Sequence, residues 1–177
     1  MMMRPAFWTL GAIAALGAPV GAQPARPDPS PARIEAAARK IVAGARYAAF
    51  VTLDDTGRPR TRQVEPRAPD SVWTVWFATN PKTRKVSEIA RDPRVVLHYF
   101  DAKLAGYVSL VGQARIVRDR ATKDSHWAPK WSAFYRDRDS SVVLVEVRAE
   151  RLEVVCAALG IEGDKGTWLP PSIRIKP

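Results

Sequence analysis

The sequence predicts a mainly β protein, a small antiparallel barrel with a few helices around it. Short segments rich in β-branched and aromatic residues recur along the chain, and residues with turn chemistry separate them. Only three stretches repeat apolar residues at helical spacing. A chain of 177 residues with 46% hydrophobic residues can build one core without a disulfide or metal, and Cys156 is its single cysteine.

The first 22 residues have the layout of a secretory signal peptide. Arg4 supplies a positive start, residues 7–18 are apolar and uncharged, and small residues precede a cleavage position after Ala22. The apolar run is shorter than the roughly 20 residues that span a bilayer. We therefore expect cleavage and a periplasmic or secreted protein without stable membrane insertion, with a retained anchor as the alternative. Residues 23–30 form a Pro-rich linker, and the domain is expected over residues 31–177.

One helix and three strands are expected in the first half of the domain. Ser30 and Pro31 open a helix whose apolar residues keep helical spacing until Gly44. Strands are predicted over residues 47–54, 60–67 and 72–79, because each is rich in β-forming residues or alternates polar with apolar residues. We expect these three strands to pair in chain order as a meander.

The second half is expected to alternate helices with longer strands. Residues 83–92 show helical spacing, and strands follow over 95–100 and 107–117, where Gly112 suggests a bulge. Residues 119–135 form a helical region that Pro129 interrupts. One or two further strands are expected over 141–155, before a Gly-rich tail.

The net charge of +10 and the pI of about 10.3 indicate anionic partners, such as nucleic acid, an acidic membrane or phosphorylated small molecules. The arginines are scattered, however, and no run of five or six like charges occurs. No zinc-finger spacing or aromatic RNA-binding signature is present. A solvated basic surface is therefore favoured over a nucleic-acid footprint.

The strongest chemical signal lies where the third strand passes into a helix. Backbone N–H groups at a helix N-terminus attract phosphate. Thr79 and Thr83 add hydroxyl donors there, and Arg84 and Lys85 add positive charges. Because cations oppose the dipole at this end of a helix, their presence suggests an anion between them. Ordinary solvated helix charges are the alternative.

This stretch resembles the phosphate-binding segment of the pyridoxamine 5′-phosphate oxidase-like family of FMN-binding split β-barrels, and most closely its general-stress-protein branch. The family pattern is aromatic-x-Thr, then Ser/Thr-Arg-Lys, then Asn/Asp-Pro-Arg, which residues 77–79, 83–85 and 92–94 match. The resemblance spans about residues 45–155. It implies a six-stranded antiparallel split barrel, FMN as the cofactor, and a homodimer with each site at its interface.

The resemblance also implies contacts with the flavin. Arg62, Gln63 and Val64 occupy the position that lies against the ring and ribityl chain, with Arg62 near N1–C2=O and Gln63 using mainly its backbone. Tyr107 and Ser109 belong to the dimer-related half, and Trp168 would cover the site. The alternatives are a solvent-facing Arg62 and a Trp168 that caps the core. The full set of candidate cofactor-binding residues is Arg62, Gln63, Val64, Ala78, Thr79, Thr83, Arg84, Lys85, Tyr107, Ser109 and Trp168.

No catalytic side chain is evident in the sequence. His98 and His126 lack metal-ligand spacing, so we expect structural roles for both and no metal site. No nucleophile elbow and no Rossmann or Walker glycine pattern occurs. True pyridoxamine oxidases commonly carry glutamine where this chain has Tyr107, which argues against their substrate. The sequence thus predicts an FMN-dependent oxidoreductase of unknown substrate; a non-catalytic flavin-binding or stress-protection protein, and F420 or haem in place of FMN, are the alternatives.

Overall fold

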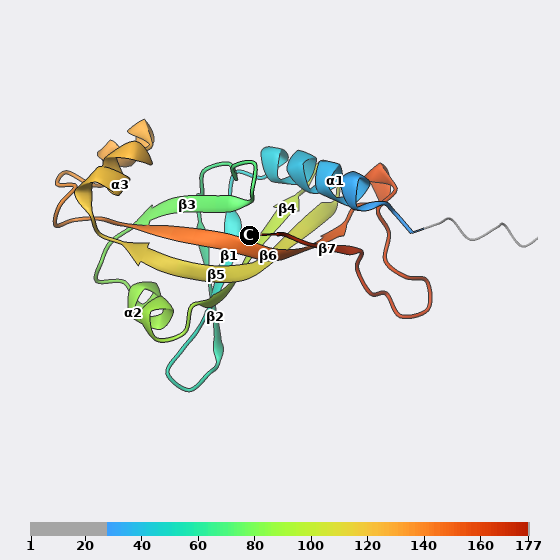
Figure 1. Cartoon of the computed structure of the whole chain (residues 1–177), viewed down its shortest axis with the longest axis horizontal. Coiled ribbons are helices and arrows are strands. Elements are labelled where there is room, and N and C mark those ends of the chain that lie inside the picture. The colour runs from blue at the N-terminus through green and yellow to red at the C-terminus, as the bar shows by residue number, and fades with distance from the viewer. Residues whose placement is uncertain (1–27, 177) are drawn as a thin grey trace, which may run out of the picture.

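The structure, a computed structural model, describes residues 28–176 (Figure 1). The expected signal peptide, its cleavage site and residues 23–27 of the linker lie outside the described residues. Within residues 28–176, no helix is both long and apolar enough to cross a membrane.

One antiparallel sheet forms the body of the protein. Its order is β2-β1-β4-β5-β6-β3, and β7 lies beside β6. The mainly β fold predicted from the sequence is confirmed. The expected count of six strands was wrong, because the chain after Pro171 returns along β6 as a seventh, and the sheet does not close. The strands are β1 Ala48–Leu53, β2 Pro59–Val64, β3 Thr74–Thr79, β4 Arg94–Asp101, β5 Gly106–Val117, β6 Val143–Val155 and β7 Ser172–Arg174.

The predicted meander of the first three strands was also wrong. β1 and β2 form a hairpin, but β3 pairs with β6, with Trp76 opposite Glu146. Pro66 and Pro69 in the β2–β3 connection have no N–H to donate to a strand ladder. The connection instead runs beside β3, where the Arg67 N–H donates to the Trp76 carbonyl at 2.8 Å.

Gly112 marks the expected bulge in β5. The register with β6 shifts between Val111 and Gly112. A Cβ atom at Gly112 would lie 2.0 Å from the carbonyl oxygen of Arg148. Only glycine allows the two backbones to approach this closely, so the bend in the long β5–β6 ribbon depends on it.

Within the described residues, three α-helices accompany the sheet: α1 Pro31–Gly44, α2 Arg84–Arg91 and α3 Arg120–Ser125. In Figure 1, α1 lies above the sheet, α2 below it and α3 beyond its left end. Ser30 caps α1 by accepting from the Arg33 N–H, as predicted. The helical region after β5 breaks before Pro129, also as predicted, where the 3-10 helix η1 (Pro129–Ala133) begins; a second 3-10 helix, η2, spans Ala157–Leu159.

Two hydrophobic clusters hold these elements together. The main core lies between α1 and the inner face of the sheet, where Ile41, Phe50 and Leu110 are completely buried. A smaller cluster around Trp76 and Trp131 fixes the α3–η1 segment to the other face of β3. Burial of apolar area on this scale is the main driving force for folding.

Candidate functional site

The start of α2 brings three of the predicted phosphate ligands together. Lys85 Nζ donates to Thr79 Oγ1 at 3.0 Å, and the hydroxyls of Thr79 and Thr83 lie 3.3 Å apart. Thr83 is the N-cap residue, but its hydroxyl donates to the Asn80 carbonyl instead of accepting from its own helix. The first turn of α2 contains no acidic residue. Helix N–H groups, two hydroxyls and an ammonium group therefore converge without a carboxylate in that turn, which suits a phosphate.

Lys85 is held in a setting that disfavours its charge. The side chain is half-buried, and burial together with the nearby Arg62 charge lowers the pKa of Lys85, although Glu88 opposes this shift. A bound anion would offset both effects. Arg84, the neighbouring cation, is exposed.

Arg62 is part of a network at the inner edge of the sheet. Its Nη2 lies 2.7 Å from Glu88 Oε2, and its Nη1 donates to Thr52 Oγ1. The Thr52 hydroxyl also donates to Glu88 Oε2, at 2.6 Å. Because only 20% of the Arg62 side chain is exposed, the alternative of a solvent-facing charge was wrong. Contact of Arg62 with a flavin stays a prediction.

Glu88 and Thr52 are the members of this network that sequence reasoning missed. Both are almost completely buried. Burial raises the pKa of Glu88, but hydrogen bonds from Thr52 and Arg62 and the Arg62 charge outweigh it, so the pKa lies below its ordinary value. The available signal was an acidic residue between Val86 and Ile89, on the apolar face of a short helix. Such a residue indicates a buried carboxylate, which requires a cation as its partner.

A second group of candidates lies on the opposite face of the sheet. Strand register places Gln63, Ala49, His98 and Ser109 side by side across β2, β1, β4 and β5. Side chains alternate between the two faces along a strand, and Phe50, which follows Ala49 in β1, points into the core. The four residues therefore point to the outer face of the sheet. Arg62 and Gln63, adjacent in β2, therefore belong to different faces.

His98 joins this outer group unexpectedly. Its Nδ1 lies 2.9 Å from Ser109 Oγ, and its ring lies 5.2 Å from that of Tyr107. Burial lowers the pKa of His98. The sequence predicts only a structural role for this residue, and no local motif marks it. The signal was the register of β4 against β5, which depends on tertiary structure.

The residues at the start of α2 and the Arg62 network together form the α2 cluster, namely Thr52, Arg62, Thr79, Thr83, Arg84, Lys85 and Glu88. The side chains of the remaining candidates are not part of it. Val64 packs against the main core, and Ala78 packs against the smaller cluster around Trp76. Trp168 is 85% exposed, so the alternative that it caps the core was wrong. The loop that carries Trp168, which precedes β7, extends from the opposite end of the molecule from α2 (Figure 1).

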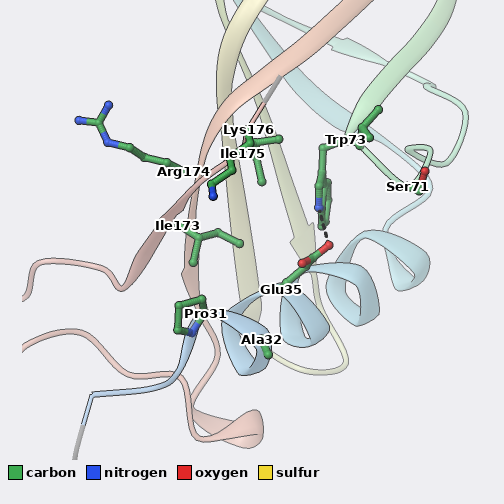
Figure 2. Close-up of a pocket in the computed structure, with 10 residues that line it drawn as sticks. Pro31, Ala32, Glu35, Ser71, Trp73, Ile173, Arg174, Ile175 and Lys176 are labelled. Carbon is green, nitrogen blue, oxygen red and sulfur yellow. Dashed lines mark hydrogen bonds between the residues drawn. The ribbon is translucent and has the colours of Figure 1, made fainter.

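A pocket of about 390 Å³ contains none of these candidates. It lies between the start of α1, the β2–β3 connection and β7 (Figure 2). Trp73 Nε1 donates to Glu35 Oε1 at 3.0 Å in its wall, and Arg174 points away from the pocket. Its charges are few and of both signs, so it offers no converging set of ligands. Among residues 28–176, no group of three or more His, Cys, Asp or Glu side chains could hold a metal.

The chain belongs to the pyridoxamine 5′-phosphate oxidase-like family, whose model matches residues 35–158. A search of the curated proteins gives no match. The fold is similar to that of a Clostridium acetobutylicum protein related to general stress protein 26, with 20% identity and a TM-score of 0.66 over 81% of this chain and 94% of that one.

Two further solved structures have the same fold. A pyridoxamine 5′-phosphate oxidase-related, FMN-binding protein from Nostoc punctiforme is 15% identical, with a TM-score of 0.53 over 82% of this chain and 94% of that one. A heme-binding protein from Mycobacterium smegmatis is 21% identical, with a TM-score of 0.58 over 82% of this chain and 58% of that one. The structural similarity shows that the split-barrel fold is shared. The sequence identities are too low to transfer a ligand from these proteins to this chain.

Proposed function

We propose that this protein binds FMN and acts as a flavin-dependent oxidoreductase. The observation that carries the proposal is the convergence of Thr79, Thr83 and Lys85 at the start of α2. There the helix N–H groups and the two hydroxyls would hold the phosphate, and Lys85 and Arg84 would neutralise it. Bound FMN would supply hydride exchange at its ring N5.

The other residues of the α2 cluster would position and polarise the cofactor. Glu88 and Thr52 fix the Arg62 guanidinium at the inner edge of β2, next to the phosphate ligands. Glu88 offsets much of the Arg62 charge, so Arg62 would act on a flavin ring chiefly by directing its guanidinium N–H groups at the ring, where they would favour the extra electron density of a reduced flavin. Because burial already fixes the side-chain rotamer, Arg62 would lose little entropy when the cofactor binds.

A second copy of this chain is part of the proposal. The α2 cluster and the His98, Tyr107 and Ser109 group occupy different faces of one sheet, so one chain alone does not surround a single ligand with both. The outer face carries Phe100, 57% exposed, directly opposite Tyr107. Exposed aromatic side chains of this kind favour a protein interface. In the proposed homodimer, the outer group of one copy completes the site of the other, in a periplasmic or secreted protein.

The test is an FMN titration of the purified protein, followed by flavin absorbance and fluorescence. The double variant Arg84→Ala/Lys85→Ala should bind FMN at least about a hundredfold more weakly, because two charge-assisted contacts are lost. Lys40→Ala/Lys176→Ala removes the same charge at positions outside the α2 cluster and should bind normally. A wild-type protein that does not bind FMN, or a double variant that binds it equally well, would refute the proposal. Turnover with a reduced nicotinamide donor separates an oxidoreductase from a flavin-storage protein.

Haem is a second candidate, favoured by the environment of His98. The Ser109 hydroxyl engages Nδ1, so Nε2 would be the nitrogen that binds the iron of a haem on the outer face. Addition of haem should then give a Soret band that His98→Ala abolishes and Arg84→Ala/Lys85→Ala leaves intact. FMN binding should instead be lost in Arg84→Ala/Lys85→Ala, which the haem candidate predicts to be without effect.

A further inference from the structure

A second pocket, about 230 Å³, lies between the end of α1, the segment after β2 and η1. None of the candidate flavin-binding residues lines it. Its polar lining comes from distant parts of the chain, namely Arg46, Glu65, Arg67, Tyr99 and Lys130. At roughly 30 Å³ for each water, it has room for about seven water volumes, which is too small for a flavin nucleotide.

Tyr99 is the unusual member of this lining. It points from β4 toward the inner face of the sheet and is 1% exposed. Among the residues that the structure describes, none makes a hydrogen bond with its hydroxyl. Buried hydroxyl groups are nearly always paired, so an unpaired one at a pocket suggests an external partner. Burial raises the pKa of Tyr99, so the phenol stays neutral and its O–H remains a donor that requires an acceptor.

The charges around the pocket indicate which acceptor it takes. Glu65 is shared by Arg46 Nε and Lys130 Nζ, each 3.0 Å from its Oε1. Arg67 donates instead to the backbone carbonyl of His126 at 2.9 Å, so its charge meets no carboxylate there. Three cations against one carboxylate leave two positive charges around the opening.

We propose that this pocket binds a small oxyanion, a carboxylate or a phosphate, that accepts a hydrogen bond from Tyr99 and is held by Arg67 and Lys130. A neutral buried donor supplies direction, and the two cations at the opening supply charge. The site is independent of the proposed flavin site, because the two share no residue.

Melting temperature measurements test this, with sodium phosphate and sodium acetate compared against sodium chloride at equal ionic strength. Comparing the phosphate and acetate series shows which of the two oxyanions the pocket binds. We expect a saturable rise with at least one of them and none with chloride. In Tyr99→Phe the apparent Kd should increase about tenfold or more, because a hydrogen bond to a charged ligand is lost. Without anion, the same variant should be as stable as wild type or more stable, since no unpaired hydroxyl is buried.

Two further variants make the outcome specific. Arg67→Gln should also weaken the anion effect while leaving Tyr99 in place, and Lys40→Gln on α1, outside the pocket lining, should not. All measurements are repeated in the Arg84→Ala/Lys85→Ala background, so that phosphate bound at α2 does not contribute. An anion effect that persists there supports the proposal even if FMN does not bind. The absence of a saturable rise would overturn the proposal, and so would a rise that Tyr99→Phe retains in full, because the anion would then bind without Tyr99.

Discussion

Arg62 and Glu88 form a buried ion pair, with 2.7 Å between Nη2 and Oε2, that joins strand β2 to helix α2. Thr52 donates to the same carboxylate oxygen from β1. Three elements therefore meet on one side chain, and the charges of Arg62 and Glu88 both act on Lys85. The position of the proposed phosphate site depends on this link, because α2 is only eight residues long and its polar anchor to β1 and β2 is Glu88.

Glu88→Gln should destabilise the protein. The substitution leaves the Arg62 guanidinium buried and without its counter-charge, which costs about 3 kcal/mol of unfolding free energy for a well-buried pair. Urea denaturation measures the loss. Arg94→Ala, which removes an exposed ion pair with Asp92, is the matched control and should leave the midpoint nearly unchanged. Equal effects of the two variants would contradict the structural role of Glu88.

The Glu88 carboxylate should also make the free energy of unfolding fall as the pH is lowered. The pKa of Glu88 in the folded protein lies below its ordinary value of 4.5, so the unfolded chain binds more protons in this range. The contribution of Glu88 is therefore complete above about pH 4.5 and is lost as the pH falls through the folded-state pKa. Urea midpoints between pH 3 and 7 should fall less steeply on the acid side in Glu88→Gln than in wild type. Parallel curves would show that another group is responsible.

Gly112→Ala should be strongly destabilising. The added methyl would lie 2.0 Å from the Arg148 carbonyl, and the contact is with backbone, which has little space to move. Overpacking of this kind costs about 1–3 kcal/mol or more, and thermal unfolding should show a clearly lower melting temperature. Gly166→Ala is the control, since its methyl would approach no atom closer than 3.5 Å. A Gly112→Ala protein as stable as wild type would mean that the β5–β6 bulge can relax.

Trp168→Ala separates folding from binding. The indole is 85% exposed, so the unfolding free energy should stay within about 0.5 kcal/mol of wild type. If Trp168 of one copy covers the flavin of the other, the variant should bind FMN more weakly and quench flavin fluorescence less. The measurement is a fluorescence titration of both proteins, at a concentration where size-exclusion chromatography detects the proposed homodimer. Unchanged affinity and quenching would place Trp168 outside the site.

Local chemistry in the sequence was enough to predict most of the elements and the grouping of Thr79, Thr83 and Lys85 at the start of α2. The N-cap of α1, the break at Pro129 and the run from Thr79 to Lys85 depend on residues within a few positions of one another, and all of them are read from short patterns. The bulge at Gly112 was predictable for the same reason, because a glycine inside a strand pattern often marks a bulge or a close approach of two backbones.

Strand partners and long-range side-chain contacts were decided only by the tertiary structure. The pairing of β3 with β6, the seventh strand and the place of His98 beside Ser109 depend on register between residues far apart in the chain. The same holds for Arg62, which the sequence places against a flavin, with a solvent-facing strand charge as the alternative, and which the fold pairs with Glu88, 26 positions away. Such contacts are selected by the packing of the whole core, because a change of one residue in register moves every side chain of a strand to the other face.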